Sequence, residues 1–306
     1  DERRPQGRPK DGAANEPARA QPAAHPRHPP RAGAAGRGRV TMLTAGVEGI
    51  GILAPGIAGW PATVDVLAGR AAYQPAPTAL APPAVLPSAE RRRASRLVKA
   101  ALGVGLEAVA HAGADASTLA TVFSSSSGDG HNCHALCETL ASDDRAVSPT
   151  RFHNSVHNAA AGYWGIATGA MAPSQVLCAY DASFAAGLLE AMTQVTTSGS
   201  PVLLVAYDAE YPEPIFARRP VPDAGGVALL LSPKAGDRSM AALKVSLGDT
   251  PISMMNDAAL EALRTAIPAM RALPMLDLLA RRQAGSVSLE YLAPLQVVAE
   301  VTPTNV

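Results

Sequence analysis

The sequence has little of several residue types, and each shortage narrows the possible folds and functions. Aromatic residues make up only 4% of the 306 residues, so alanine, glycine and proline must carry much of the packing. Three cysteines are too few for a disulfide framework. No stretch approaches the roughly 18 consecutive apolar residues of a membrane span, and the N-terminus lacks the apolar core of a signal peptide. We therefore expect a cytoplasmic protein with no membrane partner.

Charge is balanced overall but unevenly distributed. Residues 1–41 hold nine Lys or Arg and four Asp or Glu, a charge of +5, and the remainder carries −5. An acidic body argues against nucleic acid as a partner, because phosphate binding needs a concentrated basic face. Residues 1–39 contain no Val, Ile, Leu, Met, Phe, Tyr or Trp, so they cannot bury enough surface to offset the entropy of ordering. We predict that residues 1–41 form a disordered tail.

Beyond the tail, continuous apolar runs alternate with segments of helical periodicity. The runs that predict strands are 45–56, 119–123, 176–179, 201–207, 223–232, 240–247, 287–291 and 296–301. Helices are expected over 60–69, 88–112, 131–144, 182–198 and, with interruptions at prolines, 256–285. Hydrophobic content of 47% is sufficient for a real core. Near-continuous apolar strands that alternate with helices predict a layered α/β fold.

Histidine and cysteine gather in the helix expected over 131–144. The residues are His131, Cys133, His134 and Cys137. Four positions within one and a half helical turns cannot all face one zinc ion, so we interpret the helix as burying an apolar face. That face would consist of Cys133, Leu136, Cys137 and Leu140. His153 and His157 have the spacing of a metal pair but no accompanying third ligand. We therefore predict neither a metal nor a cofactor.

The chain is arranged around the junction that follows the apolar run 176–179. Phe184, Leu188 and Met192 succeed one another at helical spacing, so residues 180–182 form a tight corner between a strand and a helix. Such a corner holds one side chain beside the free N–H groups of the helix's first turn, where enzymes often place a nucleophile. Here that residue is Asp181. We expect its carboxylate to accept hydrogen bonds from these N–H groups and to stay ionised.

The corner and its approach resemble the N-terminal half of the β-ketoacyl synthases, in the thiolase-like superfamily. Three features carry the resemblance: NAAAG at 158–162, a Gly169 turn with Pro173–Ser174, and CAYDAS at 178–183. In that family an asparagine helix leads to a Gly-Pro-Ser turn, a strand and an Asp-Thr-Ala-Cys-Ser-Ser corner, whose cysteine takes the acyl chain. Asp181 stands at the position of this cysteine, and Cys178 stands at the family's aspartate. The nucleophile is missing from its place.

The resemblance implies a thiolase-like layered fold with a single N-terminal-type half. We predict this β-ketoacyl synthase-like domain over residues 42–235 and a C-terminal α/β extension over residues 236–306. A half without its second half would leave a large apolar face, which favours association. In working synthases the second half supplies two histidines and a lysine, whereas the last histidine of this chain is His157.

The resemblance therefore implies a non-catalytic subunit similar to chain length factors. Such subunits pair with an active β-ketoacyl-ACP synthase and shape its acyl tunnel in polyketide, fatty-acid-like or aryl polyene biosynthesis. The implied partners are a synthase subunit in a heterodimer, or a second copy in a homodimer, and an acyl carrier protein. The candidate tunnel or interface residues are His134, Cys137, Glu138, Ala141, Asn158 and Phe184.

Two other functions remain open at this stage. One is an active acyltransferase or thioesterase of the same fold, with Cys178 or Ser183 as its nucleophile. The other is a stand-alone scaffold or binding module. The first would need a general base, and residues 42–306 offer only His111, His131, His134, His153 and His157.

Overall fold

One mixed sheet organises residues 42–304, which are the residues that the structure, a computed structural model, describes. The tail predicted over residues 1–41 lies outside this range. The strand order is β4-β3-β5-β6-β1-β7-β9-β8, and β2 (Ile57–Ala58) pairs with the end of β1. The strands are β1 (Leu43–Ala54), β3 (Ala120–Ser124), β4 (Ser174–Leu177), β5 (Val202–Asp208), β6 (Gly225–Ser232), β7 (Ala241–Gly248), β8 (Gly285–Leu289) and β9 (Gln296–Pro303).

The centre of the sheet is its most apolar part. Every residue of β5 and β6 is buried, as their continuous apolar runs predict. β3 pairs in parallel with β4 and with β5, whereas β5, β6 and β1 pair antiparallel. The predicted strand at 176–179 is β4, which lies at the end of the sheet with its four residues exposed or only half-buried. A continuous apolar run such as 176–179 predicts a buried strand, and this prediction is wrong here, because an edge strand has a neighbour on one side only.

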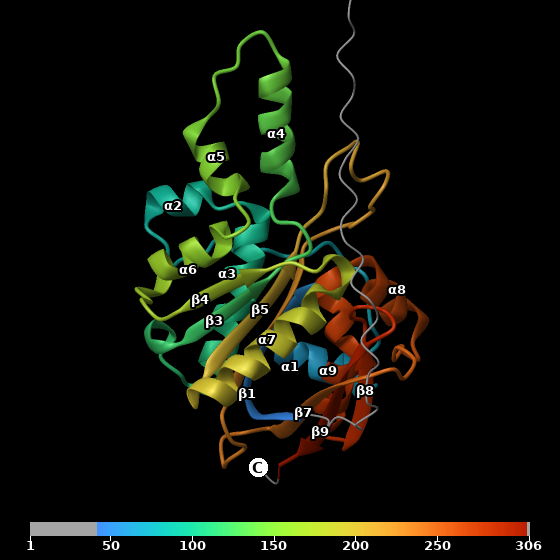
Figure 1. The fold of residues 1–306 in the computed structure, drawn as a ribbon. Helices are drawn as coiled ribbons and strands as arrows, with labels where there is room; N and C mark the ends of the chain where they lie inside the picture. Colours follow the sequence, from blue (N-terminus) through green and yellow to red (C-terminus); the bar gives the residue numbers. More distant parts are fainter. Residues whose placement is uncertain (1–41, 305–306) are drawn as a thin grey trace, which may run out of the picture. The chain divides into compact units, whose positions relative to one another are not determined.

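Helices cover both faces of the sheet (Figure 1). On one face lie α3 (Arg96–Ala112) and α6 (Ala159–Thr168). On the other lie α1 (Trp60–Leu67), α7 (Ser183–Ser198), η3 (Pro268–Ala272) and α9 (Leu273–Arg281), with α8 (Ala258–Ala266) beside them. The helix expected over 88–112 is two helices, because α2 (Ser88–Arg93) ends before Ser95, whose hydroxyl caps α3. Leu97, Ala101, Val104 and Ala108 have the spacing of an apolar helical stripe, and they are buried where α3 packs on the sheet.

The C-terminal segment continues the same sheet. β7 pairs with β1, β9 pairs with β7, and β8 and β9 form an antiparallel hairpin. η3 packs against α7, and α9 packs against α1 and β9. The boundary predicted at residue 235 falls between β6 and β7, within one compact unit that contains all the described residues. The expectation of a large open apolar face is wrong on the α7 side, because the C-terminal segment covers that face.

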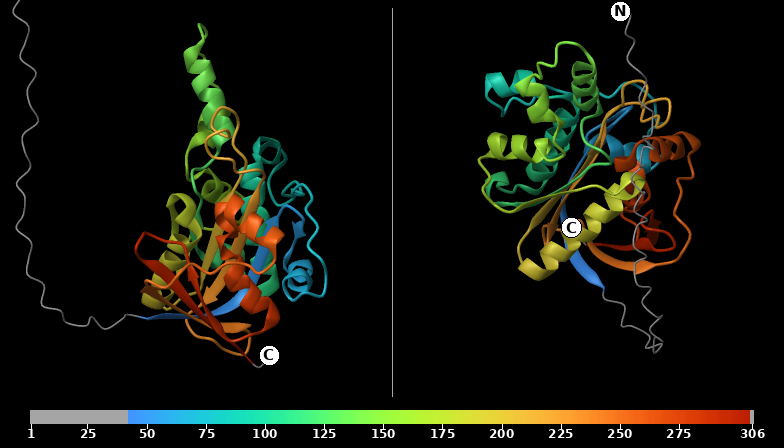
Figure 2. Two further views of the ribbon diagram at one scale, coloured as in Figure 1. Left: turned by 90° about the vertical axis from the view of Figure 1, so that its right-hand side faces the viewer. Right: turned by 45° about the horizontal axis from the view of Figure 1, so that its top comes forward.

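Two helices project beyond the end of the sheet, α4 (Gly130–Ala141) and α5 (Pro149–Ser155) (Figures 1 and 2). α4 packs mainly against α5 and has no buried residue. Cys133 and Cys137 are exposed, and so is Leu140. The predicted burial of this helix face is therefore wrong for the chain by itself. Over residues 42–304 we find no helix with the length and apolar character that a membrane crossing requires.

Candidate functional site

The predicted corner is present between β4 and α7. The strand ends at Leu177, residues 180–182 form the short 3-10 helix η2 (Tyr180–Ala182), and α7 begins at Ser183. Tyr180 has a φ of 55°, a left-handed conformation that non-glycine residues seldom adopt and that is common at functional sites. The Ser183 hydroxyl accepts a bond from the Ala179 N–H (3.0 Å) and donates to the Tyr180 carbonyl (2.7 Å). These two bonds hold the turn closed.

Asp181 is held by arginines rather than by the helix. Its Oδ1 lies 2.8 Å from an Nη of Arg219, and its Oδ2 lies 3.7 Å from an Nη of Arg271. The N-cap of α7 is Ala182, and no side chain caps this helix. The predicted bonds from the helix N–H groups to Asp181 are therefore wrong. Hydrogen bonds between two charged partners are stronger than bonds to neutral N–H groups, which explains the choice of partner.

The two arginines come from segments far from the corner in sequence. Arg219 lies in the loop between β5 and β6, and its guanidinium carbon stacks 3.6 Å from the centre of the Tyr180 ring. Burial would lower the pKa of Arg219, but a hydrogen bond with Tyr211 and the charge of Asp181 outweigh this and raise it. The Asp181 carboxylate is thus paired with a permanent cation.

Arg271 brings the C-terminal segment to the corner. It lies in η3, its side chain is only 9% exposed, and its Nε is 3.2 Å from Oε2 of Glu290. One Nη also donates to the Arg264 carbonyl at 3.0 Å. Arg271 therefore joins Asp181 to the end of the β8–β9 hairpin. A carboxylate held between two guanidiniums is a poor nucleophile for a thioester, because its lone pairs are already engaged.

A buried carboxylate, Asp208, stabilises the position of the segment that carries Arg271, and it is not among the residues predicted from the sequence. Asp208 ends β5, and its two oxygens accept bonds from the N–H groups of Ser126 (2.8 Å) and Ala269 (2.9 Å). Burial raises its pKa to about 6, although these N–H bonds and the charge of Arg219 act to lower it. Asp208 thereby ties η3, which carries Arg271, to the central strand. The one sequence signal is an aspartate directly after the apolar run 201–207.

The other candidates are dispersed. Cys178 is exposed at the end of β4, and Ser183 is buried with its hydroxyl engaged. Within residues 42–304, no hydrogen bond or ion pair connects either of them to a histidine. On α4, His134 Nε2 lies 3.3 Å from Glu138 Oε1, and both Cys137 and Ala141 are exposed. Asn158 is exposed, whereas Phe184 is fully buried in the core under α7.

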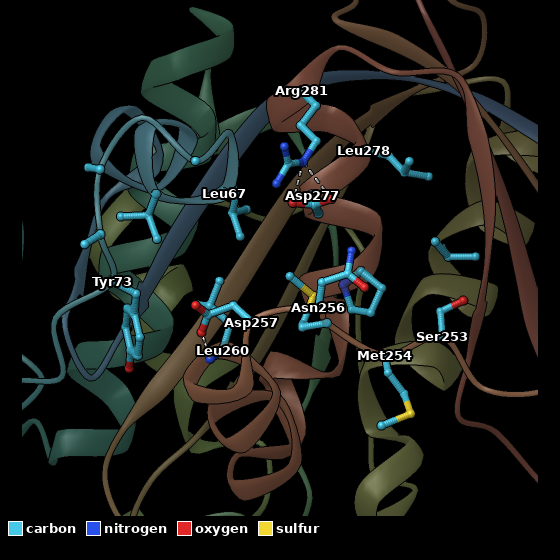
Figure 3. Close-up of a pocket in the computed structure, with 17 residues that line it drawn as sticks. Leu67, Tyr73, Ser253, Met254, Asn256, Asp257, Leu260, Asp277, Leu278 and Arg281 are labelled. Atoms are coloured by element: carbon cyan, nitrogen blue, oxygen red, sulfur yellow. Dashed lines mark hydrogen bonds and ion pairs between the residues drawn. The ribbon is translucent and has the colours of Figure 1, made fainter.

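Cavities lie beside the corner and between the helices of the neighbouring α1, α8 and α9 layer. One, of about 340 Å³, borders the corner and is lined by Tyr180, Asp181, Arg218 and Arg219 among others. The second, of about 470 Å³, lies between α1, α8 and α9 and is lined by none of the predicted site residues (Figure 3). Its carboxylates have local partners: Asp257 caps α8, and Asp277 binds the Nε of Arg281. In the described part of the chain, no group of three or more His, Cys, Asp or Glu is placed to hold a metal ion.

Comparison with known proteins identifies the family. The family model for the N-terminal domain of β-ketoacyl synthases matches residues 67–288. The chain belongs to this family. The matched residues extend past residue 235, into the segment predicted to be a C-terminal extension. No curated protein sequence matches it.

Solved structures share the fold of this β-ketoacyl synthase-family chain. A ketosynthase (ApeO) in complex with its chain length factor (ApeC) from Xenorhabdus doucetiae matches with 23% identity, a TM-score of 0.64 and coverage of 84% of this chain and 99% of the other. The ishigamide ketosynthase/chain length factor matches with 14% identity, a TM-score of 0.63 and coverage of 86% and 100%. At such identities the likeness shows the fold alone. The predicted thiolase-like layered fold is confirmed.

A third structure with this fold contains a carrier protein. It is a type II PKS acyl-carrier protein in complex with its ketosynthase bound to the hexaketide (AntDE:AntF). The identity is 9%, the TM-score is 0.66, and the match covers 86% of this chain and 100% of the other.

Proposed function

We propose that this chain is a non-condensing, chain-length-factor-like subunit that pairs with an active β-ketoacyl synthase in polyketide- or fatty-acid-like biosynthesis. The observation that carries the proposal is the residue at the corner between β4 and α7, together with its contacts. Asp181 stands where the family has its acyl-accepting cysteine, and its two oxygens face Arg219 and Arg271. Such a corner holds the fold together and does not accept an acyl group. The structural neighbours that contain chain length factors support the same function.

The exposed apolar surface supports association with a partner. β4 has a free edge in the described sheet, and an unpaired strand edge is a template for pairing with another chain. Large apolar side chains are exposed on the segment that leads to and follows this strand. They are Leu140, Phe152, Val156, Ile166, Met171 and Tyr180. We propose that this surface, the α4–β4 surface, contacts the synthase partner.

The α4–β4 surface can be tested by adding a charge to it. Phe152 is 63% exposed and Met171 is 94% exposed, so Phe152→Asp and Met171→Asp should leave the fold intact. Met254→Asp is the matched control, because Met254 is 68% exposed and lies at the cavity between α1, α8 and α9. Burying an unpaired carboxylate in an interface costs several kcal/mol. Co-purification with a full-length β-ketoacyl synthase should therefore fail for both surface variants and persist for the control. Equal binding by all three variants would contradict the proposed surface.

The non-condensing role has a separate test. A synthase reconstituted with this chain and a malonyl-loaded acyl carrier protein should condense, and it should do so equally well with the Asp181→Asn variant. Intact-mass measurement should find no acyl adduct on this chain. An adduct on Asp181, Cys178 or Ser183 would instead support an active acyltransferase or thioesterase. A chain that neither binds a synthase nor affects condensation would point to a stand-alone binding module.

A further inference from the structure

We propose that the cavity beside the corner binds a small oxyanion, a phosphate or carboxylate group, through Arg218 and Arg219. The cavity has a volume of about 340 Å³, which lies in the lower part of the range for small-molecule sites. Val221 and Ala266 form apolar parts of the cavity wall, and Tyr180 and Asp181 line the side of the cavity next to the corner. The site would recognise the charged group of a ligand and leave room for a small apolar part.

The charges at this cavity favour an anion. The charged side chains that line it are Asp181, Arg218 and Arg219, a net charge of +1. Asp181 is already engaged by Arg219 and Arg271. Arg218 is exposed, and its guanidinium makes no ion pair or hydrogen bond within residues 42–304. An arginine offers a planar set of N–H donors that matches carboxylate and phosphate oxygens, and it is less strongly hydrated than lysine.

The backbone of both arginines and the side chain of Arg219 are already positioned. The N–H groups of both Arg218 and Arg219 donate to the Ile215 carbonyl at 2.9 Å, so the backbone of this loop is fixed in a turn. The Arg219 side chain is fixed by Asp181 and by the Tyr180 ring. A pre-ordered site loses less conformational entropy when a ligand binds. Thr265 also lines the cavity, but its hydroxyl donates to main-chain carbonyls of α8, so the arginines are the available donors.

Binding should be measured by calorimetry with inorganic phosphate and, separately, with acetate, at one constant ionic strength because salt screens exposed charges. Arg218→Gln should weaken binding of the tighter ligand at least about tenfold. Asp181→Asn should strengthen it by roughly tenfold, because it removes a like charge within a few ångströms of the anion. Arg219 would keep its contacts with the Tyr180 ring and with Tyr211, which hold its side chain in place. Arg238→Gln is the matched control: Arg238 is 70% exposed, forms an ion pair with Glu48 and does not line the cavity.

The relative affinities for phosphate and acetate indicate which charged group a natural ligand would carry. Tighter binding of phosphate indicates a phosphate-bearing ligand, and tighter binding of acetate indicates a carboxylate-bearing one. Absence of binding for both overturns the proposal, as does equal weakening by Arg218→Gln and Arg238→Gln. Weaker binding to Asp181→Asn, when the variant is folded, also overturns it. The measurement uses the isolated chain, so its outcome does not depend on whether a synthase partner binds the α4–β4 surface.

Discussion

Replacing Asp181 by asparagine tests whether the corner depends on its ion pairs. The change removes the charge that faces Arg219 and Arg271 but keeps the size of the side chain. Hydrogen bonds to charged groups contribute about 1.5–3 kcal/mol when they are well formed. The Asp181 side chain is 30% exposed, so solvent screening reduces this value. Arg271 also keeps Glu290 as a partner. We therefore expect Asp181→Asn to lower the free energy of unfolding by about 1–2 kcal/mol.

The matched control is Asp277→Asn. Asp277 has almost the same exposure, 26%, but it pairs with Arg281, whose side chain is 43% exposed. An exposed pair one helical turn apart contributes only about 0.3–0.5 kcal/mol. Urea denaturation should show a clearly larger drop in midpoint for Asp181→Asn, with an unchanged slope. If Asp181→Asn loses no more stability than Asp277→Asn, the inference that Arg219 and Arg271 fix the corner through Asp181 is wrong.

Two further predictions concern the core. Asp208 has a pKa of about 6 in the folded protein against an ordinary 3.8, so its contribution to stability is full below its unfolded pKa and is lost as pH rises through 6. Urea denaturation at pH 5 and pH 7 should show a loss of about 1 kcal/mol from this group, and Asp208→Asn should abolish the difference. Gly51→Ala would place its Cβ 2.0 Å from the Val104 carbonyl. It should lower the free energy of unfolding by about 3 kcal/mol or more, whereas Gly162→Ala, which meets only open space, should be neutral or stabilising by about 1 kcal/mol.

The sequence predicts well those parts of the fold that depend on local pattern. β5 and β6 read as continuous apolar runs, and a strand buried on both faces requires such a run. The buried stripe of α3 follows from helical spacing in the same way. The corner at 180–182 was predictable because the period changes from strand to helix within three residues. These features are set by residues close together in the chain.

Burial against a distant neighbour was not predictable in this way. The pattern of α4 shows an apolar face, but it does not show what covers it. Among the helices and strands of residues 42–304, α5 is the one that packs substantially against α4. The same holds for the apolar run 176–179, which predicts an interior strand, whereas β4 (Ser174–Leu177) lies at the edge of the sheet. Both are on the proposed α4–β4 surface, so the residues that mislead a prediction for the isolated chain are those that a partner would bury.

The sequence identifies the central residue of the site but not its partners, because those partners come from distant segments of the chain. Asp181 was identifiable because its position in the corner is defined locally. Its partners were not, because Arg219 is 38 residues away in a proline-rich loop and carries no periodic signal. Arg271 lies in η3, beyond the residues that resemble the family's corner.

The contacts of the C-terminal segment give a physical reason for an aspartate at position 181. η3 reaches α7 and the corner, where Arg271 is almost fully buried and needs a carboxylate on each side. A cysteine at position 181 would leave Arg271 with Glu290 as its remaining ion-pair partner within residues 42–304, and it would remove the ion pair of Arg219 with Asp181. Burying guanidinium groups without enough negative charge is costly. An aspartate at the corner therefore helps to hold this segment against the domain, which is consistent with the proposed non-condensing role.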